Sequence, residues 1–401
     1  MNHLLNPFAP GAGTPPPELS GRSDLIERGR IALARVQHGR SEKGLILVGL
    51  RGVGKTVLLN ELRSQAGELG FATCPIEAHE AKPLAALLVP HLRRILIDLD
   101  RSGQLSTQVK RAMRVFRGFI GALRLKVSDI EISMDIDPEP GIADSGDLEV
   151  DLPDMIAELG KAAAARNCAI GLFIDEIQYC STLELSALIM AIHRAAQERL
   201  PIFLCAAGLP QVVSLFGRSK SYAERLFDFP RIGPLDPHDA ANALQRPAEQ
   251  ADVRFTDAAL AAIQHKTGGY PFFLQEWGYH SWNQAKNSPI NADDVALATR
   301  TAIARLDEGF FRVRFNRLTP REKDYLRAMA EIGPGPHRSG DIAKLLHKRT
   351  SDLGLLREGL INKGMIYAPA HGDIAFTVPL FDLFLHRIMP DWPPPPGCPP
   401  Q

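Results

Sequence analysis

One stretch constrains the fold of this chain more than any other: GLRGVGKTVLLNEL, residues 49–62. It follows the apolar run LILV, which is typical of a buried strand, and its last residues are apolar at helical spacing. Gly49, Gly54, Lys55 and Thr56 satisfy the pattern GxxxxGK[ST], in which glycines let backbone N–H groups approach a phosphate closely. A helix that begins near Lys55 adds unpaired N–H donors and the positive end of its dipole. The stretch therefore predicts a strand, a phosphate-binding loop and a helix.

The loop also predicts its ligands. We expect eight residues to bind nucleotide: Gly49, Leu50, Arg51, Gly52, Val53, Gly54, Lys55 and Thr56. The ammonium of Lys55 would lie on the β- and γ-phosphates, and the hydroxyl of Thr56 would bind Mg²⁺. ATP and Mg²⁺ are therefore the expected ligands.

A second motif, LFIDE, supplies carboxylates at the end of the most strand-like run, residues 168–176. An ionised side chain at the end of a buried strand needs a partner or a cleft. We expect Asp175 to hold Mg²⁺ through water and Glu176 to act as general base on the attacking water. The alternative is that the two carboxylates only cap the helix predicted at 182–198. With the loop upstream, the motif predicts ATP hydrolysis.

Composition limits the possible partners. The 401 residues suffice for two or three domains, and Lys+Arg and Asp+Glu both total 46, so nucleic-acid binding would need a local basic patch. The five cysteines lack metal-ligand spacing and indicate buried thiols in a reducing compartment. Since no run of 18 apolar residues exists and the first twenty residues are unlike a signal peptide, we expect a cytoplasmic protein without membrane contact.

Strand-like runs alternate with helical ones through the first half of the chain. Continuously apolar strands of this kind are typical of a parallel sheet covered on both faces, so the fold class is α/β. The expected strands are 45–49, 71–77, 168–176 and 201–208. A basic segment, 108–126, and an acidic one, 129–154 with a hairpin strand at 130–136, interrupt this order. They are interpreted as an insertion whose halves neutralise each other, with a binding surface as the alternative.

The second half is predicted to be helical from 237 to 315, with helix starts at Asp236, Thr256 and Asn291. Residues 319–389 contain three expected helices and a short hairpin, and the Pro-rich tail is expected to be disordered. The first twenty residues cannot form a regular helix and are expected to lie over the next domain.

The order of these motifs resembles a group of prokaryotic ATPases on the AAA+/STAND side of the P-loop proteins, similar to origin-recognition initiator ATPases. The resemblance covers residues 5–389 and rests on NPFAPG, PPPELSGR, LFIDEIQY, AAGLP, SYAERLF, TGGYPFFLQ and a C-terminal winged helix. It implies a P-loop NTPase (AAA+-like) parallel sheet of five strands, a helical lid and a winged-helix domain. The expected domains are an extended segment 1–20, an ATPase core 21–235 with an insertion at about 100–150, a lid 236–315, a winged helix 316–389 and a disordered tail 390–401.

The resemblance also implies roles for three further residues. Arg22 would pack near the adenine, and Pro271 would lie against the base. Arg225 would be an arginine finger that reaches the γ-phosphate of a neighbouring subunit, which implies a homo-oligomer or a partner protein. Simpler roles are open for two of them: Arg225 could pair with Asp228 or Glu224, and Pro271 could only start a helix.

Two departures from the family pattern predict slow or partner-dependent hydrolysis. The strand 201–208 ends without the usual Asn or Thr that senses the γ-phosphate, unless Gln211 substitutes. The lid helix 271–284 lacks the arginine expected as a second sensor, and only Lys266 before it is basic.

The C-terminal region has the features of a DNA-binding winged helix. Thr319 and Ser339 are expected to cap its first two helices, and the third is predicted at 347–366. Five apolar residues of the third helix are expected to point inward: Leu353, Leu355, Leu356, Leu360 and Ile361. Its leading residues would meet a major groove: Lys348, Arg349, Thr350 and Ser351. The charge of 319–389 is nearly balanced, which weakens this interpretation.

Two functional hypotheses remain. In the first, an ATP-dependent switch couples its nucleotide state to double-stranded DNA through the winged helix. In the second, a STAND-like signalling or defence ATPase uses the winged helix to contact protein. A metabolic kinase is disfavoured because no acceptor-substrate pocket is indicated in the lid, and a wing would have no role in one.

Overall fold

The structure is a computed structural model that describes residues 1–11, 13–100, 106–123 and 137–392. Contacts divide the chain into two compact units. We call Ser23–Val48 with Lys55–Arg231 the sheet unit, and Met1–Arg22 with Gly49–Gly54 and Ile232–Gln401 the C-terminal unit.

The sheet confirms the predicted fold class. Its five parallel strands are β1 (Gly44–Gly49), β2 (Phe71–Glu77), β3 (Ala169–Asp175), β4 (Ile202–Gly208) and β5 (Phe227–Asp228). Their order is β2-β3-β4-β1-β5, and β6 (Arg231–Ile232) also pairs with β1. All residues of β1 and β4 are buried, as expected for strands covered on both faces.

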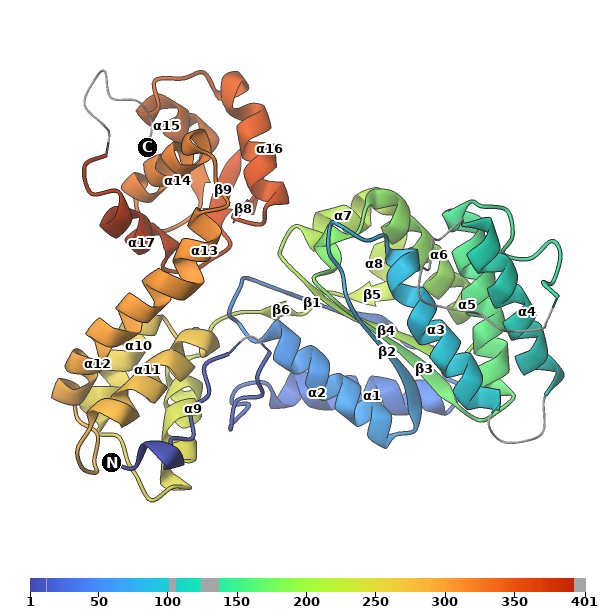
Figure 1. Ribbon diagram of the computed structural model, residues 1–401, viewed down its shortest axis with the longest axis horizontal. Helices are drawn as coiled ribbons and strands as arrows, with labels where there is room; N and C mark the ends of the chain where they lie inside the picture. The colour runs from blue at the N-terminus through green and yellow to red at the C-terminus, as the bar shows by residue number, and fades with distance from the viewer. Residues whose placement is uncertain (12, 101–105, 124–136, 393–401) are drawn as a thin grey trace. The chain divides into compact units, whose positions relative to one another are not determined.

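Six longer helices and two short ones accompany the sheet. They are α1 (Ser23–Gln37), α2 (Lys55–Glu68), α3 (Leu84–Asp100), α4 (Thr107–Ala122), α5 (Leu148–Ala164), α6 (Thr182–Gln197), α7 (Val212–Ser219) and α8 (Ala223–Leu226). The chain crosses the sheet one way from β1 to β2 and returns through β3 and β4. Because such crossovers are right-handed, α2 covers one face, and α5 and α6, which lie side by side, cover the other (Figure 1).

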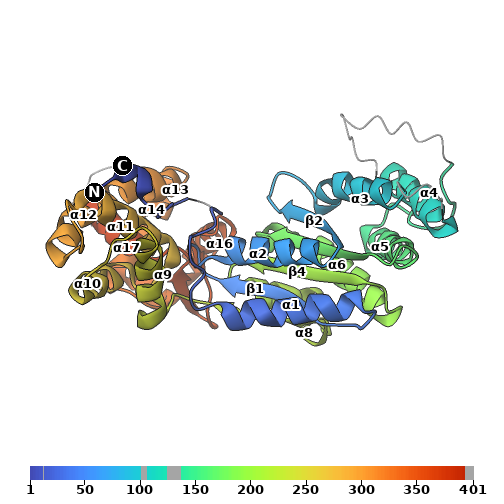
Figure 2. The same ribbon diagram turned by 90° about the horizontal axis from the view of Figure 1, so that it is seen from below.

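The inserted helix α4 packs on α3 and α5, with Val109, Met113 and Phe116 buried (Figure 2). Two ion pairs join its basic side chains to acidic ones: Arg111 to Glu158 at 3.1 Å, and Arg114 to Glu139 at 2.8 Å.

The Arg114–Glu139 pair joins the basic segment to the acidic one, as the interpretation of an insertion with mutually neutralising halves expects, whereas Glu158 lies beyond the acidic segment. Helix α5 begins at Leu148, within the acidic segment, because the Asp147 side chain accepts the N–H of Glu149 and caps the helix there. The hairpin strand predicted at 130–136 lies outside the described residues.

The middle of the C-terminal unit is helical. It contains α9 (Pro237–Glu249), α10 (Asp257–Thr267), α11 (Pro271–Gln284), α12 (Ala292–Arg305), a π-helical segment Leu306–Phe311 and α13 (Arg312–Phe315). The predicted caps Asp236, Thr256 and Asn291 each accept a backbone N–H at the start of their helices. These starts are therefore confirmed.

The N-terminal segment packs on these helices. Its one short helical turn is the 3-10 turn η1 (His3–Leu5). Phe8 is 2% exposed within their core, and the side chain of Asn6 donates to the carbonyl of Tyr279 at 3.0 Å. The segment therefore packs on the helical region, and the expectation that it lies over the next domain along the chain is wrong.

The last part of the C-terminal unit has winged-helix architecture. It consists of α14 (Pro320–Ile332), α15 (Ser339–Leu345), α16 (Gly354–Asn362), the antiparallel strands β7 (His337–Arg338), β8 (Ile366–Tyr367) and β9 (Asp373–Phe376), and α17 (Phe381–Ile388). The strand order is β7-β9-β8. Thr319 and Glu322 form a capping box at the start of α14, so that predicted cap is confirmed. Arg387 of α17 pairs with Asp307 at 2.6 Å.

Three details of the predicted second and third helices are wrong. Ser339 is the first residue of α15 rather than its cap, and its hydroxyl donates to the Gly372 carbonyl. The third helix begins only at Gly354, because a 3-10 turn precedes it at Thr350–Leu353. Leu355 is 86% exposed, since Leu356 and Leu360 share the inward face and Leu355 is rotated away from it.

Candidate active site

The phosphate-binding loop joins the end of β1 at Gly49 to the start of α2 at Lys55. Gly52 and Gly54 have φ of 78° and 89°, in the left-handed region that side chains with a Cβ disfavour. A Cβ on Gly49 would lie 2.3 Å from the carbonyl oxygen of Ile232. The left-handed backbone therefore favours glycine at positions 52 and 54. At position 49, the nearby Ile232 carbonyl leaves no room for a Cβ.

The sheet unit brings the predicted cation-binding residues into contact. Thr56 Oγ1 donates to Asp175 Oδ2 at 2.6 Å, and Asp175 Oδ1 accepts the N–H of Glu176 at 2.8 Å. Burial raises the pKa of the Asp175 carboxyl, whereas the Thr56 hydrogen bond and the charge of Lys55 act in the opposite direction. Lys55 is only 7% exposed. A buried carboxylate in this setting would gain from an added cation.

These groups fit Mg²⁺. The Thr56 hydroxyl and the Asp175 carboxylate are both oxygen donors, the ligand type that Mg²⁺ prefers, and they lie at hydrogen-bonding distance from each other. Bound there, the ion would neutralise charge on the phosphates.

Glu176 has a left-handed backbone, with φ of 51°, directly after β3. Its side chain accepts a hydrogen bond from the amide of Gln178, a residue that the sequence analysis did not single out. The sequence does place a glutamine two residues beyond the carboxylate pair. Which groups that side chain can reach, however, depends on where β4 ends.

Two residues assigned through the family resemblance lie in the C-terminal unit. The guanidinium of Arg22 donates to the Gly233 carbonyl; burial lowers its pKa, while the charge of Asp239 raises it. Pro271 is the first residue of α11, and the next residue, Phe272, donates its N–H to the Gly52 carbonyl at 3.1 Å. Pro271 therefore both starts a helix and directly precedes a contact with the phosphate loop.

The phosphate loop has a second contact in the C-terminal unit. The N–H of Arg51 donates to the carbonyl of Thr377 at 3.0 Å. Thr377 follows β9, is fully buried, and donates its own N–H to the Met365 carbonyl at 3.0 Å. This contact could not be predicted from the sequence, since its partners are remote in the chain.

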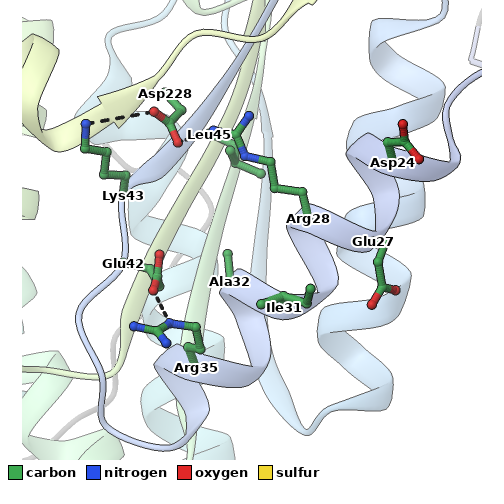
Figure 3. Close-up of a pocket in the computed structure, with 10 residues that line it drawn as sticks. All are labelled: Asp24, Glu27, Arg28, Ile31, Ala32, Arg35, Glu42, Lys43, Leu45 and Asp228. Atoms are coloured by element: carbon green, nitrogen blue, oxygen red, sulfur yellow. Dashed lines mark hydrogen bonds and ion pairs between the residues drawn. The ribbon is translucent and has the colours of Figure 1, made fainter.

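Arg225 is an exposed residue of the short helix α8. Among the described residues no ion pair involves it. Asp228, one of the partners considered for it, instead pairs with Arg28 and with Lys43, the latter at 3.9 Å (Figure 3). Exposure alone does not test the arginine-finger role, so that role of Arg225 stays a prediction.

A surface hollow of about 420 Å³ lies beside α1 and β5, and Figure 3 shows the residues that line it. Its charged side chains largely pair with each other, as Arg35 does with Glu42. None of the predicted site residues lines it. The hollow is therefore distinct from the nucleotide site.

The four residues assigned to a DNA groove are all exposed, but they precede α16 rather than lie in it. Lys348 and Arg349 lie before the 3-10 turn, and Thr350 and Ser351 begin that turn. Arg349 forms an ion pair with Asp352 at 2.9 Å. Arg349 is therefore partly neutralised.

Two family models match separate parts of the chain. Residues 18–205 match the AAA ATPase domain, so the chain contains such a domain, with nucleotide binding as its expected property. Residues 308–385 match a domain of unknown function, DUF8462. No curated protein matches the sequence. None of the described helices has the length and apolar character needed to cross a bilayer.

Solved structures resemble the chain in fold. The Walker-type ATPase PABY2304 of Pyrococcus abyssi is 16% identical with a TM-score of 0.53, over 95% of this chain and 99% of that one. Cdc6p from Pyrobaculum aerophilum is 15% identical with a TM-score of 0.49, over 98% of both chains. The Thermotoga maritima RuvB Holliday junction branch migration motor is 17% identical with a TM-score of 0.47, over 91% of this chain and 96% of that one.

Proposed function

We propose that this protein is an ATP-hydrolysing switch whose nucleotide state controls the binding of double-stranded DNA by the winged helix. One observation carries the proposal: the phosphate loop is hydrogen-bonded through Arg51 to the wing at Thr377. The neighbouring Gly52 carbonyl accepts from Phe272 at the start of α11. The loop that would hold the phosphates is thus in direct contact with both elements that would respond to them.

The contact with the wing can transmit a change because Thr377 is held firmly. Its N–H donates to Met365, and its hydroxyl donates to the Gly364 carbonyl. A shift of the loop backbone would therefore move the β8–β9 hairpin with it or break the bond to Arg51. The hydrogen bond between Arg51 and Thr377 is kept in one of these states and broken in the other. A nucleotide that binds one state more tightly shifts the equilibrium between them by that difference in affinity.

Four residues would carry out hydrolysis. Lys55 binds the β- and γ-phosphates, and Thr56 and Asp175 hold Mg²⁺. Glu176 accepts the proton of the attacking water. The exposed Arg225 would complete the site of a neighbouring subunit in a homo-oligomer. Since α11 contains no arginine, we expect slow turnover in an isolated chain.

The DNA contact would begin at Lys348 and Arg349, where two cations and two hydroxyl side chains are exposed before α16. Such groups at the start of a recognition helix reach phosphates and base edges.

A second candidate function is protein contact through the same helix. Leu355 is 86% exposed on α16, and Glu358 is exposed one turn further along the same face. An apolar and an acidic side chain on that face suit a protein surface better than a phosphate backbone. The STAND-like alternative rests on this observation.

The two candidates are separated by duplex binding. In the DNA account, Lys348→Glu with Arg349→Glu weakens duplex affinity strongly, and the parent's log affinity falls linearly with log salt. The matched control is Arg300→Glu with Arg305→Glu, the same charge change on exposed residues of α12, which should leave affinity nearly unchanged. If the parent binds no duplex at low salt in any nucleotide state, the protein-contact account takes its place.

A further inference from the structure

The side chain of Gln178 joins the ends of two neighbouring strands of the sheet unit, β3 and β4. Its Nε2 donates to Glu176 Oε2, immediately after β3. Its Oε1 accepts the N–H of Leu209, immediately after β4, at 3.0 Å. One amide therefore connects the carboxylate assigned as general base to the strand end where the family resemblance expects a γ-phosphate sensor.

The local sequence is adapted to this bridge. A Cβ on Gly208 would lie 2.8 Å from Gln178 Oε1, so the strand must end in glycine for the amide to approach. Gln178 lies in the 3-10 turn Ile177–Tyr179, whose first residue is fully buried. The Tyr179 N–H donates to the Glu176 carbonyl at 3.0 Å. The backbone that carries the amide is therefore fixed on both sides.

Among the described hydrogen bonds, none joins the side chain of Asp175 or of Gln211 to the Glu176 carboxylate. Asp175 uses its oxygens for the Thr56 hydroxyl and for the backbone N–H of Glu176. Gln211, the substitute sensor considered from the sequence, has a buried Oε1 without a hydrogen-bond partner among the described residues. Of the two glutamines, Gln178 is therefore the one that hydrogen-bonds to the Glu176 carboxylate.

We propose that Gln178 is a positioning residue for hydrolysis: it orients the Glu176 carboxylate and ties it to the end of β4, in place of the polar side chain that β4 lacks. The inference rests on the proposed ATP hydrolysis with Glu176 as base. Gln178 acts through Glu176 and has no role in phosphate binding. Its loss should therefore lower kcat and leave nucleotide affinity intact, because a misplaced base slows only the chemical step.

The test uses two substitutions of similar size in the full-length chain. Gln178→Met removes both hydrogen bonds, and Gln178→Glu removes the donor to Glu176 but retains an acceptor for Leu209. We expect both to lower kcat by about ten- to a hundredfold, with the dissociation constant of a fluorescent ATP analogue unchanged. Gln65→Met, the same substitution at a glutamine of α2 that hydrogen-bonds to Glu61 and has no role in the site, is the matched control and should turn over ATP at nearly the parental rate. If Gln178→Met does not fold, Gln178→Glu carries the test.

A double-mutant cycle identifies the route of action. In a Glu176→Gln background, Gln178→Met should have no further effect on turnover, because the group it orients is already inactive. Additive losses, or a Gln178→Glu variant with the parental kcat, would overturn the inference while leaving the proposed hydrolysis in place. A parent that hydrolyses no ATP, alone or assembled, would overturn both.

Discussion

At the residue scale, the site depends on side chains that the fold brings together from distant segments. Thr56 and Asp175 are 119 positions apart, yet their side chains form a 2.6 Å hydrogen bond. This pair could be predicted because parallel strands present their carboxyl ends at one edge of a sheet, where both motifs had to lie. Gln178 could not be predicted, since its two partners depend on the relative ends of β3 and β4.

Lys55→Ala removes the cation aimed at the β- and γ-phosphates. We predict that ATP affinity collapses, because Lys55 is the cation that the GK[ST] motif directs at those phosphates. The far-ultraviolet circular dichroism spectrum should not change. Isothermal titration with ATP checks the affinity, and undiminished binding by a folded variant would remove the loop from the nucleotide site.

Glu176→Gln preserves shape but removes the proton acceptor. ATP should still bind, and turnover should fall by about a hundredfold or more. Steady-state phosphate release measures the effect, with nucleotide affinity as the control. Turnover at the parental rate would show that Glu176 is not the base.

At the element scale, local signals in the sequence predicted most helix starts. Thr319 begins α14 as expected because its side chain and that of Glu322 satisfy each other's backbone N–H groups. Arg349 and Leu353 show where such signals fail. Periodicity alone suggested one continuous helix, whereas the chain forms a 3-10 turn before α16 and thereby moves the expected groove residues ahead of the helix.

Arg225 on α8 gives a prediction about assembly. Arg225→Ala should leave nucleotide affinity nearly unchanged and lower hydrolysis, since the side chain would serve a neighbour's site. Mixing it with Glu176→Gln chains, which retain Arg225, should restore part of the activity. In a protein shown to oligomerise, no recovery on mixing would assign Arg225 a structural role.

Phe8 tests the N-terminal segment as part of the helical core. A Cβ on Gly278 would approach Phe8 to 2.8 Å, so the ring fills a close-fitting site. Phe8→Ala should destabilise the C-terminal unit by about 3 kcal/mol, the usual cost of such a cavity. Thermal denaturation measures this loss. Leu4→Ala is the control, because Leu4 is 93% exposed; equal melting temperatures for the two variants would contradict the packing role.

At the scale of the whole molecule, the sheet, the helical region and the winged helix could be predicted from the sequence. The hydrogen bond between the phosphate loop and the wing could not. Four of the five parallel strands were predicted from apolar runs and the helical region from its caps, whereas the fifth strand and the winged helix were implied by the family resemblance. The hydrogen bond from Arg51 to Thr377 joins backbone atoms of a loop and a wing that are remote in sequence. No side-chain pattern encodes such a contact, so the sequence predicted coupling between nucleotide and winged helix but no route for it.

The most direct test of that coupling is the duplex DNA affinity of the parent protein, measured by fluorescence anisotropy at one low salt concentration with saturating ADP or non-hydrolysable ATP. We predict affinities that differ by about fivefold or more between the two states, the scale of a typical allosteric coupling. The difference should vanish in Lys55→Ala, which cannot respond to nucleotide. Equal affinities in the two nucleotide states of the parent would contradict the switch.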